Sequence, residues 1–286
     1  YYFSVAAINA AGLVGVPAYS DGVVIDTSAP GGVDTVNDGS GPDVDFSMDS
    51  SNFSANWSQA VDAESGIAEY YYSIGNSLCS SDTVVWTSAG AATSATAAGL
   101  SLSGGQSYYF SVAAVNRAGL VGAPGCSDGV LIDISVPDTI TVVNDGPGTD
   151  ADYSTDSSAL EANWAGTSDA ESGIAAYYYS IGASPGASDA VGWTSAGDAT
   201  SVNVSGLSLA SGETYYVTVK ALNGAGGFSE AASSDGISVD TSAPVQISSV
   251  TDGDGADIDF SADDSTLSAS WAASSDPETG VAAYYY

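Results

Sequence analysis

The chain has 286 residues, of which 35 are Asp or Glu and only two are Lys or Arg, and it has no histidine, so its formal charge is −33. Hydrophobic residues make up 44% and charged residues 13%, a composition that supplies a core and excludes a disordered acidic tail. The lack of cations excludes nucleic acid and anionic lipid as partners, and no apolar run is long enough to span a membrane.

Taken in order, the elements of the chain return at a fixed interval of 107 residues, since Trp57 recurs as Trp164 and Trp271. A repeat of this length carries its own core. We therefore predict the C-terminal part of one domain in 1–30, complete domains in 31–137 and 138–244, and the N-terminal part of a further domain in 245–286. Both ends fall inside a repeat, so we expect the array to continue beyond them.

Within a repeat, short runs of Val, Ile, Tyr, Phe and Trp alternate with Gly, Ser, Asp and Asn clusters, without a helical period. This pattern predicts an all-β fold, a tandem array of Greek-key β-sandwiches. In the first complete repeat the predicted strands are 33–37, 43–48, 53–58, 67–75, 83–88, 93–98, 106–116 and 126–133. Alternation in 43–48 predicts that Val44, Phe46 and Met48 face inward. Prolines at 30, 137 and 244 mark the borders, and the short linkers predict a semi-rigid array.

The segment Leu102-Ser103-Gly104-Gly105-Gln106-Ser107-Tyr108, followed by Phe110, Val112, Asn116 and Gly119, resembles the E–F corner and F strand of a fibronectin type III domain. The same pattern returns from Leu209 to Gly226, and the resemblance makes Trp57 of strand B a core partner. It implies a tyrosine corner, in which the buried Tyr108 bonds through its hydroxyl to the backbone. The match looks closest to the arrays of large secreted or surface proteins of bacteria. The longer repeat and its Asp-rich segment leave a cadherin-like or bacterial immunoglobulin-like sandwich as the alternative.

Acidic residues recur with the repeat and predict calcium at the domain borders. In a fibronectin-like sandwich, the A–B segment and the end of strand G face the B–C loop of the following domain, so carboxylates of two domains meet. The candidate ligands are Asp26, Asp62 and Glu64 at the first border, Asp38, Asp43, Asp45, Asp133, Asp169 and Glu171 at the second, and Asp145, Asp150, Asp152, Asp240, Asp276 and Glu278 at the third. Calcium accepts six to eight oxygen ligands, whereas zinc would need the missing histidines. A charged edge strand and a salt-adapted surface remain alternative explanations.

Cys79 and Cys126 are the only cysteines, and the next repeat has Gly186 and Ser233 in their places. Their joint presence and joint absence favour a disulfide. The predicted topology, however, starts the two residues near opposite ends of the domain, and a bridge requires their Cα atoms within about 7 Å. A disulfide and two free thiols therefore both remain open.

Catalytic signals are few. Without histidine, Ser-His-Asp and Cys-His systems are impossible, and no phosphate-binding or dinucleotide fingerprint is present. A carboxylate pair would suit glycoside hydrolysis, but the pairs recur in every repeat, as scaffolding does. We therefore expect a non-enzymatic protein.

The tyrosines leave two hypotheses for binding. Tyr71 and Tyr109 point away from their core-facing neighbours, either to contact carbohydrate or a neighbouring subunit, or to pack across strands. The sequence thus predicts a structural spacer, stalk or filament of an extracellular adhesin or other surface protein, whose partners are neighbouring repeats or further copies. The alternative is a carbohydrate- or protein-binding module accessory to a secreted hydrolase or adhesin.

Overall fold

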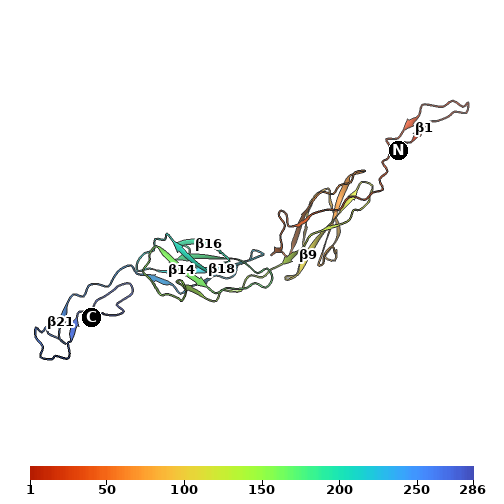
Figure 1. Ribbon diagram of the computed structural model, residues 1–286. Coiled ribbons are helices and arrows are strands. Elements are labelled where there is room, and N and C mark those ends of the chain that lie inside the picture. The colour runs from red at the N-terminus through yellow and green to blue at the C-terminus, as the bar shows by residue number, and fades with distance from the viewer. The chain divides into compact units, whose positions relative to one another are not determined.

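The structure, a computed structural model, describes residues 1–286, and it consists of strands and loops without helices. No helix with the length and apolarity of a membrane span occurs in it. The chain divides into two compact units, Tyr1–Ser135 and Val136–Tyr286, each of which contains one complete β-sandwich (Figure 1). Below they are called the first and the second unit.

The sandwich of the first unit has nine strands in two sheets. They are β3 (Val36–Asp38), β4 (Phe46–Ser47), β5 (Asn52–Trp57), β6 (Ile67–Gly75), β7 (Val84–Gly90), β8 (Ser94–Ala98), β9 (Ser107–Asn116), β10 (Gly125–Cys126) and β11 (Val130–Ile132). One sheet has the order β3-β5-β8 and the other β4-β11-β9-β6-β7, with β10 paired to β9. If the eight predicted strands are lettered A, A′, B, C, C′, E, F and G in chain order, this is A-B-E against A′-G-F-C-C′, which defines a fibronectin type III-like fold.

Period-two burial explains how these strands pack. In β5 buried residues alternate with exposed or half-buried ones, so Phe53 and Trp57 face the opposite sheet. Phe110 of β9 meets them with its side chain fully buried, and its ring lies 5.7 Å from that of Phe53 and 5.0 Å from that of Tyr72. The core of the first unit is thus an aromatic cluster between the two sheets.

The second unit repeats this arrangement. Its sandwich strands are β12 (Val143–Asp145), β13 (Tyr153–Ser154), β14 (Ala159–Trp164), β15 (Ile174–Gly182), β16 (Val191–Gly197), β17 (Ser201–Ser205), β18 (Thr214–Asn223), β19 (Ala232–Ser233) and β20 (Ile237–Val239). The sheets have the orders β12-β14-β17 and β13-β20-β18-β15-β16. Val217 stands where the first unit has Phe110, and Leu160 where it has Phe53, so this core is more aliphatic.

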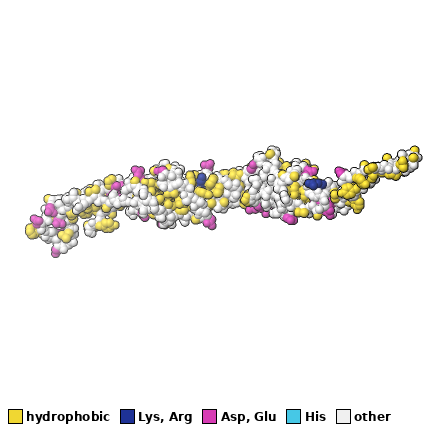
Figure 2. Space-filling view, turned by 90° about the horizontal axis from the view of Figure 1, so that it is seen from above, with side chains coloured by type: hydrophobic (Ala, Val, Ile, Leu, Met, Phe, Trp, Pro, Cys, Tyr) yellow, Lys and Arg dark blue, Asp and Glu magenta, His cyan; other side chains and the backbone are white.

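Residues outside the two sandwiches form isolated strand pairs. β1 (Ser4–Val5) pairs with β2 (Ala18–Tyr19), and β21 (Val250–Asp252) pairs with β22 (Ala269–Trp271). No second sheet packs on β1 and β2, so the hydrophobic side chains of this segment remain exposed, as Figure 2 shows for the N-terminal part of the chain.

Each predicted strand has a counterpart, with two corrections. The predicted strand 43–48 shrinks to the two residues of β4, because only these reach the parallel ladder with β11, and Val44 and Met48 are therefore exposed rather than inward. The predicted strand 126–133 breaks into β10 and β11. Gly129 lies in this break with φ of +98°, and a Cβ there would stand 2.6 Å from the Tyr109 ring, so only glycine fits.

The tyrosine corner is present in both sandwiches. The backbone N–H of Ser103 donates to the Tyr108 hydroxyl at 3.1 Å, and that of Ala210 donates to the Tyr215 hydroxyl at 3.0 Å. A second bond of this kind was not predicted from the sequence. The N–H of Ala60 donates to the Tyr70 hydroxyl at 3.0 Å, which ties the loop after β5 to β6.

Candidate functional site

The loop between β5 and β6 carries the first acidic group. It consists of Asp26, Asp62 and Glu64, all in the first unit. Each contributes one carboxylate oxygen, and the three oxygens lie within 4.8 Å of one another. Asn116, a buried residue at the end of β9, donates from its side-chain amide to Asp26 at 2.8 Å and to Asp62 at 3.1 Å. The serine Ser28 donates to Glu64 at 3.1 Å. Neutral donors thus hold three carboxylates in one place.

The same group recurs inside the second unit, with oxygens of Asp240, Asp276 and Glu278 within 4.8 Å of one another. Ser242 donates to Glu278 at 3.0 Å, as Ser28 does to Glu64, and Thr279 donates to Asp240 at 2.6 Å. The corresponding set at the middle border, Asp133 with Asp169 and Glu171, draws on both units and stays a prediction.

Hydrogen bonds favour the ionised form of one carboxylate in each group. The side-chain amide of Asn116, helped by the N–H groups of Ser65 and Gly66, lowers the pKa of Asp62 below its ordinary value. The Thr279 hydroxyl does the same for the pKa of Asp240. At neutral pH each group therefore concentrates negative charge and offers oxygen ligands of the type that calcium prefers.

A second acidic group lies within each sandwich. It joins Asp38, Asp43 and Asp128 in the first unit. Asp38 is fully buried, its Oδ2 accepts from Gly129 N–H at 3.0 Å, and its Oδ1 has no hydrogen-bond partner. Burial raises the pKa of Asp38 to about 7, against the effect of the nearby Ser127 hydroxyl and Gly129 N–H, and repulsion from Asp43 and Asp128 adds to the rise.

The second unit builds the same group from Asp145, Asp150 and Asp235. Asp145 is fully buried, and its Oδ1 also lacks a partner. Burial raises the pKa of Asp145 to about 6, with repulsion from Asp150 and Asp235 as a smaller cause.

The predicted ligands therefore fall into two kinds of group. Asp38 and Asp43 gather with Asp128, which was not among the predicted ligands, and not with Asp133. The reason is that Asp128 precedes β11 whereas Asp133 follows it. The two ends of one strand cannot serve a single ion. Asp45 and Asp152 belong to neither kind of group.

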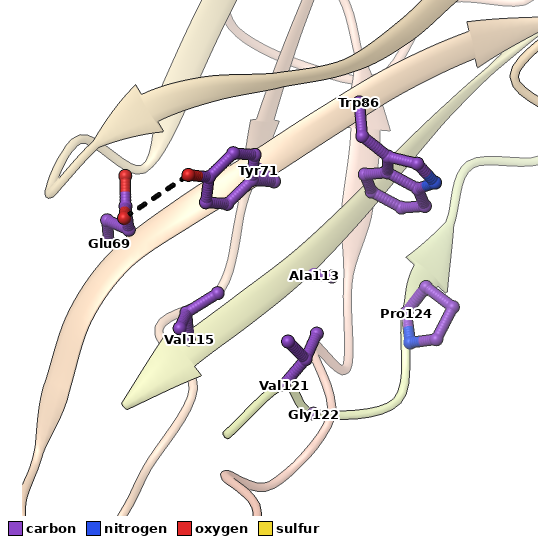
Figure 3. A pocket seen from close by; sticks show the side chains of 8 residues that line it. All are labelled: Glu69, Tyr71, Trp86, Ala113, Val115, Val121, Gly122 and Pro124. Atoms are coloured by element: carbon purple, nitrogen blue, oxygen red, sulfur yellow. Dashed lines mark hydrogen bonds between the residues drawn. The ribbon is translucent and has the colours of Figure 1, made fainter. Parts of the chain in front are cut away.

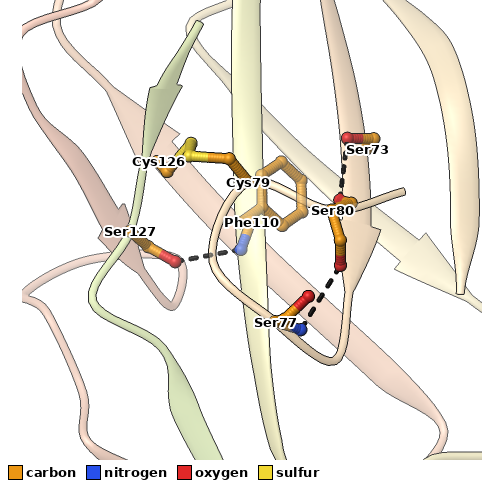
Figure 4. The surroundings of a disulfide bond; sticks show 7 residues. All are labelled: Ser73, Ser77, Cys79, Ser80, Phe110, Cys126 and Ser127. Atoms are coloured by element: carbon orange, nitrogen blue, oxygen red, sulfur yellow. Dashed lines mark hydrogen bonds between the residues drawn. A yellow bond between two sulfur atoms is a disulfide. The ribbon is translucent and has the colours of Figure 1, made fainter. Parts of the chain in front are cut away.

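Cys79 and Cys126 form a disulfide with a Cα–Cα distance of 5.6 Å. The loop after β6 folds across the sheet to reach β10, whose Cys126 lies opposite Ser111 of β9 (Figure 4). The predicted separation of the two residues overlooked this loop.

The outward tyrosines have different surroundings. The Tyr109 ring lies against Gly129 and is thereby packed. Tyr71 instead lines a groove of about 510 Å³ with Glu69, Trp86, Ala113, Val115, Val121, Gly122 and Pro124, all from the first unit (Figure 3). The Tyr71 hydroxyl donates to Glu69 at 3.4 Å.

No protein-family model matches the chain, and no curated protein matches it. Among solved structures it is similar to the FN1–FN3 domains of chicken CNTN1, at 15% identity over 82% of this chain and 76% of that chain, with a TM-score of 0.40. The fibronectin(III)-like modules of Clostridium thermocellum CbhA are similar at 15% identity over 72% of this chain and 94% of theirs, with a TM-score of 0.42. A set of titin domains is similar at 16% identity over 84% of this chain and 74% of that chain, with a TM-score of 0.48.

Proposed function

We propose that the chain is a non-enzymatic spacer array of an extracellular surface protein, a stalk or a filament-forming segment, with calcium bound at its domain borders. Repeated sandwiches provide length. The observation that supports calcium binding is that one acidic group occurs twice. It consists of Asp26, Asp62 and Glu64 in the first unit and of Asp240, Asp276 and Glu278 in the second. In both, hydroxyl and amide donors fix the carboxylates while no cationic side chain neutralises them.

The cation's role follows from where these groups lie. Asp26 precedes a border proline, and Asp62 belongs to the loop of the following sandwich. Calcium shared by the two would resist rotation about the linker, since each ligand would have to leave the ion before the linker turned. The groups around Asp38 and Asp145 would bind calcium within each sandwich and compensate the buried charge.

Calcium titration tests this function. A ligand that binds only the folded state raises the free energy of unfolding by about 2.7 kcal/mol when its concentration is 100 times its Kd. Millimolar calcium should therefore give the chain a higher melting temperature than it has in the presence of a chelator. Glu64→Gln should reduce this increment, because it removes a ligand without breaking the sandwich. Asp198→Asn, in an exposed turn outside every acidic group, is the matched control and should keep it.

The salt-adapted surface gives the opposite result. If calcium leaves the melting temperature unchanged while molar sodium chloride raises it, general screening explains the charge and the calcium proposal fails.

A binding module remains the second candidate, and one observation favours it. The groove around Tyr71 and Trp86 is lined mostly by apolar side chains and is open to solvent. Two of these side chains are accordingly exposed, Trp86 to 41% and Val121 to 60%. Exposed aromatic side chains in a groove commonly mark a contact site for carbohydrate or protein. This face would make the array an accessory to an adhesin or a secreted hydrolase.

A further inference from the structure

The groove of the first unit has a counterpart in the second that is already filled. Tyr71 of β6 lies opposite Ala113 of β9, and in the second unit Tyr178 of β15 lies opposite Lys220 of β18. Trp193 and Phe228 stand at the positions of Trp86 and Val121. The two sites therefore have the same place in the same sheet.

Lys220 occupies the second site with its ammonium group. Its Nζ lies 4.3 Å from the centre of the Trp193 ring and 4.0 Å from that of Phe228. The Tyr178 ring meets Phe228 edge to face at 5.4 Å, which holds Phe228 in position. This part of the sandwich is thus an aromatic cage that binds a primary ammonium through cation–π attraction.

The first unit keeps part of this cage and lacks the lysine. Ala113 takes the place of Lys220, so the floor of the groove is a methyl group. Glu69 takes the place of Ala176 and adds a carboxylate to the lining. Its Oε2 accepts from Ser88 at 2.6 Å and its Oε1 from Tyr71, which fixes the charge beside the groove. Compared with its counterpart in the second unit, this site lacks the cation and has a carboxylate in addition.

We infer that the groove of the first unit binds a lysine side chain of a partner polypeptide. The alkyl chain would lie over Ala113 and Val115 between the rings of Tyr71 and Trp86, and the ammonium group would reach the Trp86 face and the Glu69 carboxylate. A second copy of this chain is a poor source, because its only lysine, Lys220, is seated in its own cage. The partner is therefore a different protein with exposed lysine. A strongly acidic chain also attracts such a partner at long range.

Tryptophan indole signals of the whole chain test the inference. The chain has five Trp residues, so an ¹⁵N-labelled sample gives a few indole N–H signals, among them Trp86 in the open groove and Trp193 in the filled one. The probe is N-acetyl-lysine methylamide, and the matched control is the norleucine analogue, which has the alkyl chain without the ammonium group. We expect the lysine probe to shift Trp86 and leave Trp193 unmoved, with millimolar affinity. The norleucine analogue should bind about 2- to 30-fold more weakly, the range that cation–π attraction gives.

Two variants link the shift to the groove. Ala113→Lys should abolish the Trp86 response, because the new side chain fills the site as Lys220 does. Glu69→Gln should weaken binding about 2- to 5-fold, as expected for loss of an exposed ion pair. Unchanged signals of the buried Trp57 would show that the sandwich remains folded in both.

The inference rests on the proposed binding role of this face. A titration with a sugar distinguishes lysine from carbohydrate as the ligand of the groove. A shift of Trp86 by a β-1,4-linked glucan oligosaccharide without a response to lysine would overturn it and favour carbohydrate. Equal shifts by lysine and norleucine, equal responses of Trp86 and Trp193, or no response to lysine would also overturn it. The calcium dependence of the melting temperature is a separate measurement, so the spacer proposal stands or falls independently.

Discussion

The disulfide of the first unit should contribute most of the stability difference between the two sandwiches. It joins residues 47 positions apart, and the loop-closure entropy that it removes from the unfolded chain corresponds to about 4 kcal/mol. Cys79→Gly with Cys126→Ser gives the first unit the residues that the next repeat carries. A serine hydroxyl at position 126 would lie beside the buried hydroxyl of Ser111, which has no partner. One hydrogen bond would restore about 1 kcal/mol and leave a net loss of about 3 kcal/mol.

The second unit shows why that loss should be incomplete. There the N–H of Gly186 donates to the Thr218 hydroxyl at 2.9 Å, and this hydroxyl lies 2.8 Å from that of Ser233. Hydrogen bonds connect the same two segments that the disulfide joins in the first unit.

Native-state hydrogen exchange measures the effect unit by unit. In the double variant, amides of β9 should exchange with an opening free energy about 3 kcal/mol lower, while amides of β18 in the same molecule should remain unchanged. The melting temperature of the first sandwich should fall by roughly 12–25 °C. An unchanged exchange rate in β9, or an equal change in β18, would refute the assignment of this stability to the disulfide.

Three further perturbations have outcomes fixed by the structure. Phe110→Ala removes a fully buried ring and should lower the free energy of unfolding by about 3–5 kcal/mol in a denaturant titration; a loss below 1 kcal/mol would mean that the aromatic cluster is not the core. Gly129→Ala should cost about 1–3 kcal/mol, because φ there is +98° and the Tyr109 ring fills the space, whereas Gly41→Ala, with open surroundings, should change the melting temperature little. Hydrogen bonds from Asn52 and Ser51 hold the pKa of Asp49 far below its ordinary value, so its stabilisation is present above about pH 4 and is lost as the pH falls further. Asp49→Asn should therefore flatten the acid side of the curve of melting temperature against pH, and an identical curve would contradict this.

The sequence predicted strand positions well where the burial pattern of a single strand determines its bounds. Alternating apolar residues placed β5, β6 and β9 within one residue of their observed bounds, because burial on one face selects the strand register directly. It failed for the segment 43–48, where alternation was just as regular. Strand length there depends on how many residues can reach β11, and nothing within the segment reports that.

Contacts between distant segments were harder to predict. Asp38 and Gly129 are 91 residues apart, and only the break between β10 and β11 brings Asp128 beside Asp38 and Asp43. The break itself depends on Gly129 lying under Tyr109, which is again a tertiary contact. One signal was visible, since Asp128 and Asp235 recur with the repeat like the acidic residues that were selected.

Differences between the two repeats come in matched sets. The two cysteines are replaced together by residues that bond to Thr218, and the exchange of Lys220 for Ala113 is accompanied by that of Ala176 for Glu69. Substitution of one cysteine alone would leave an unpaired thiol. Substitution of the lysine alone would leave an aromatic cage without a charged partner. Because both positions differ together, each repeat keeps an intact contact between its segments. In the groove, the cation is supplied by Lys220 in the second unit and by the proposed binding partner in the first. Both kinds of acidic group, by contrast, recur with the same residue types in the two units, as expected if each repeat uses them in the same way.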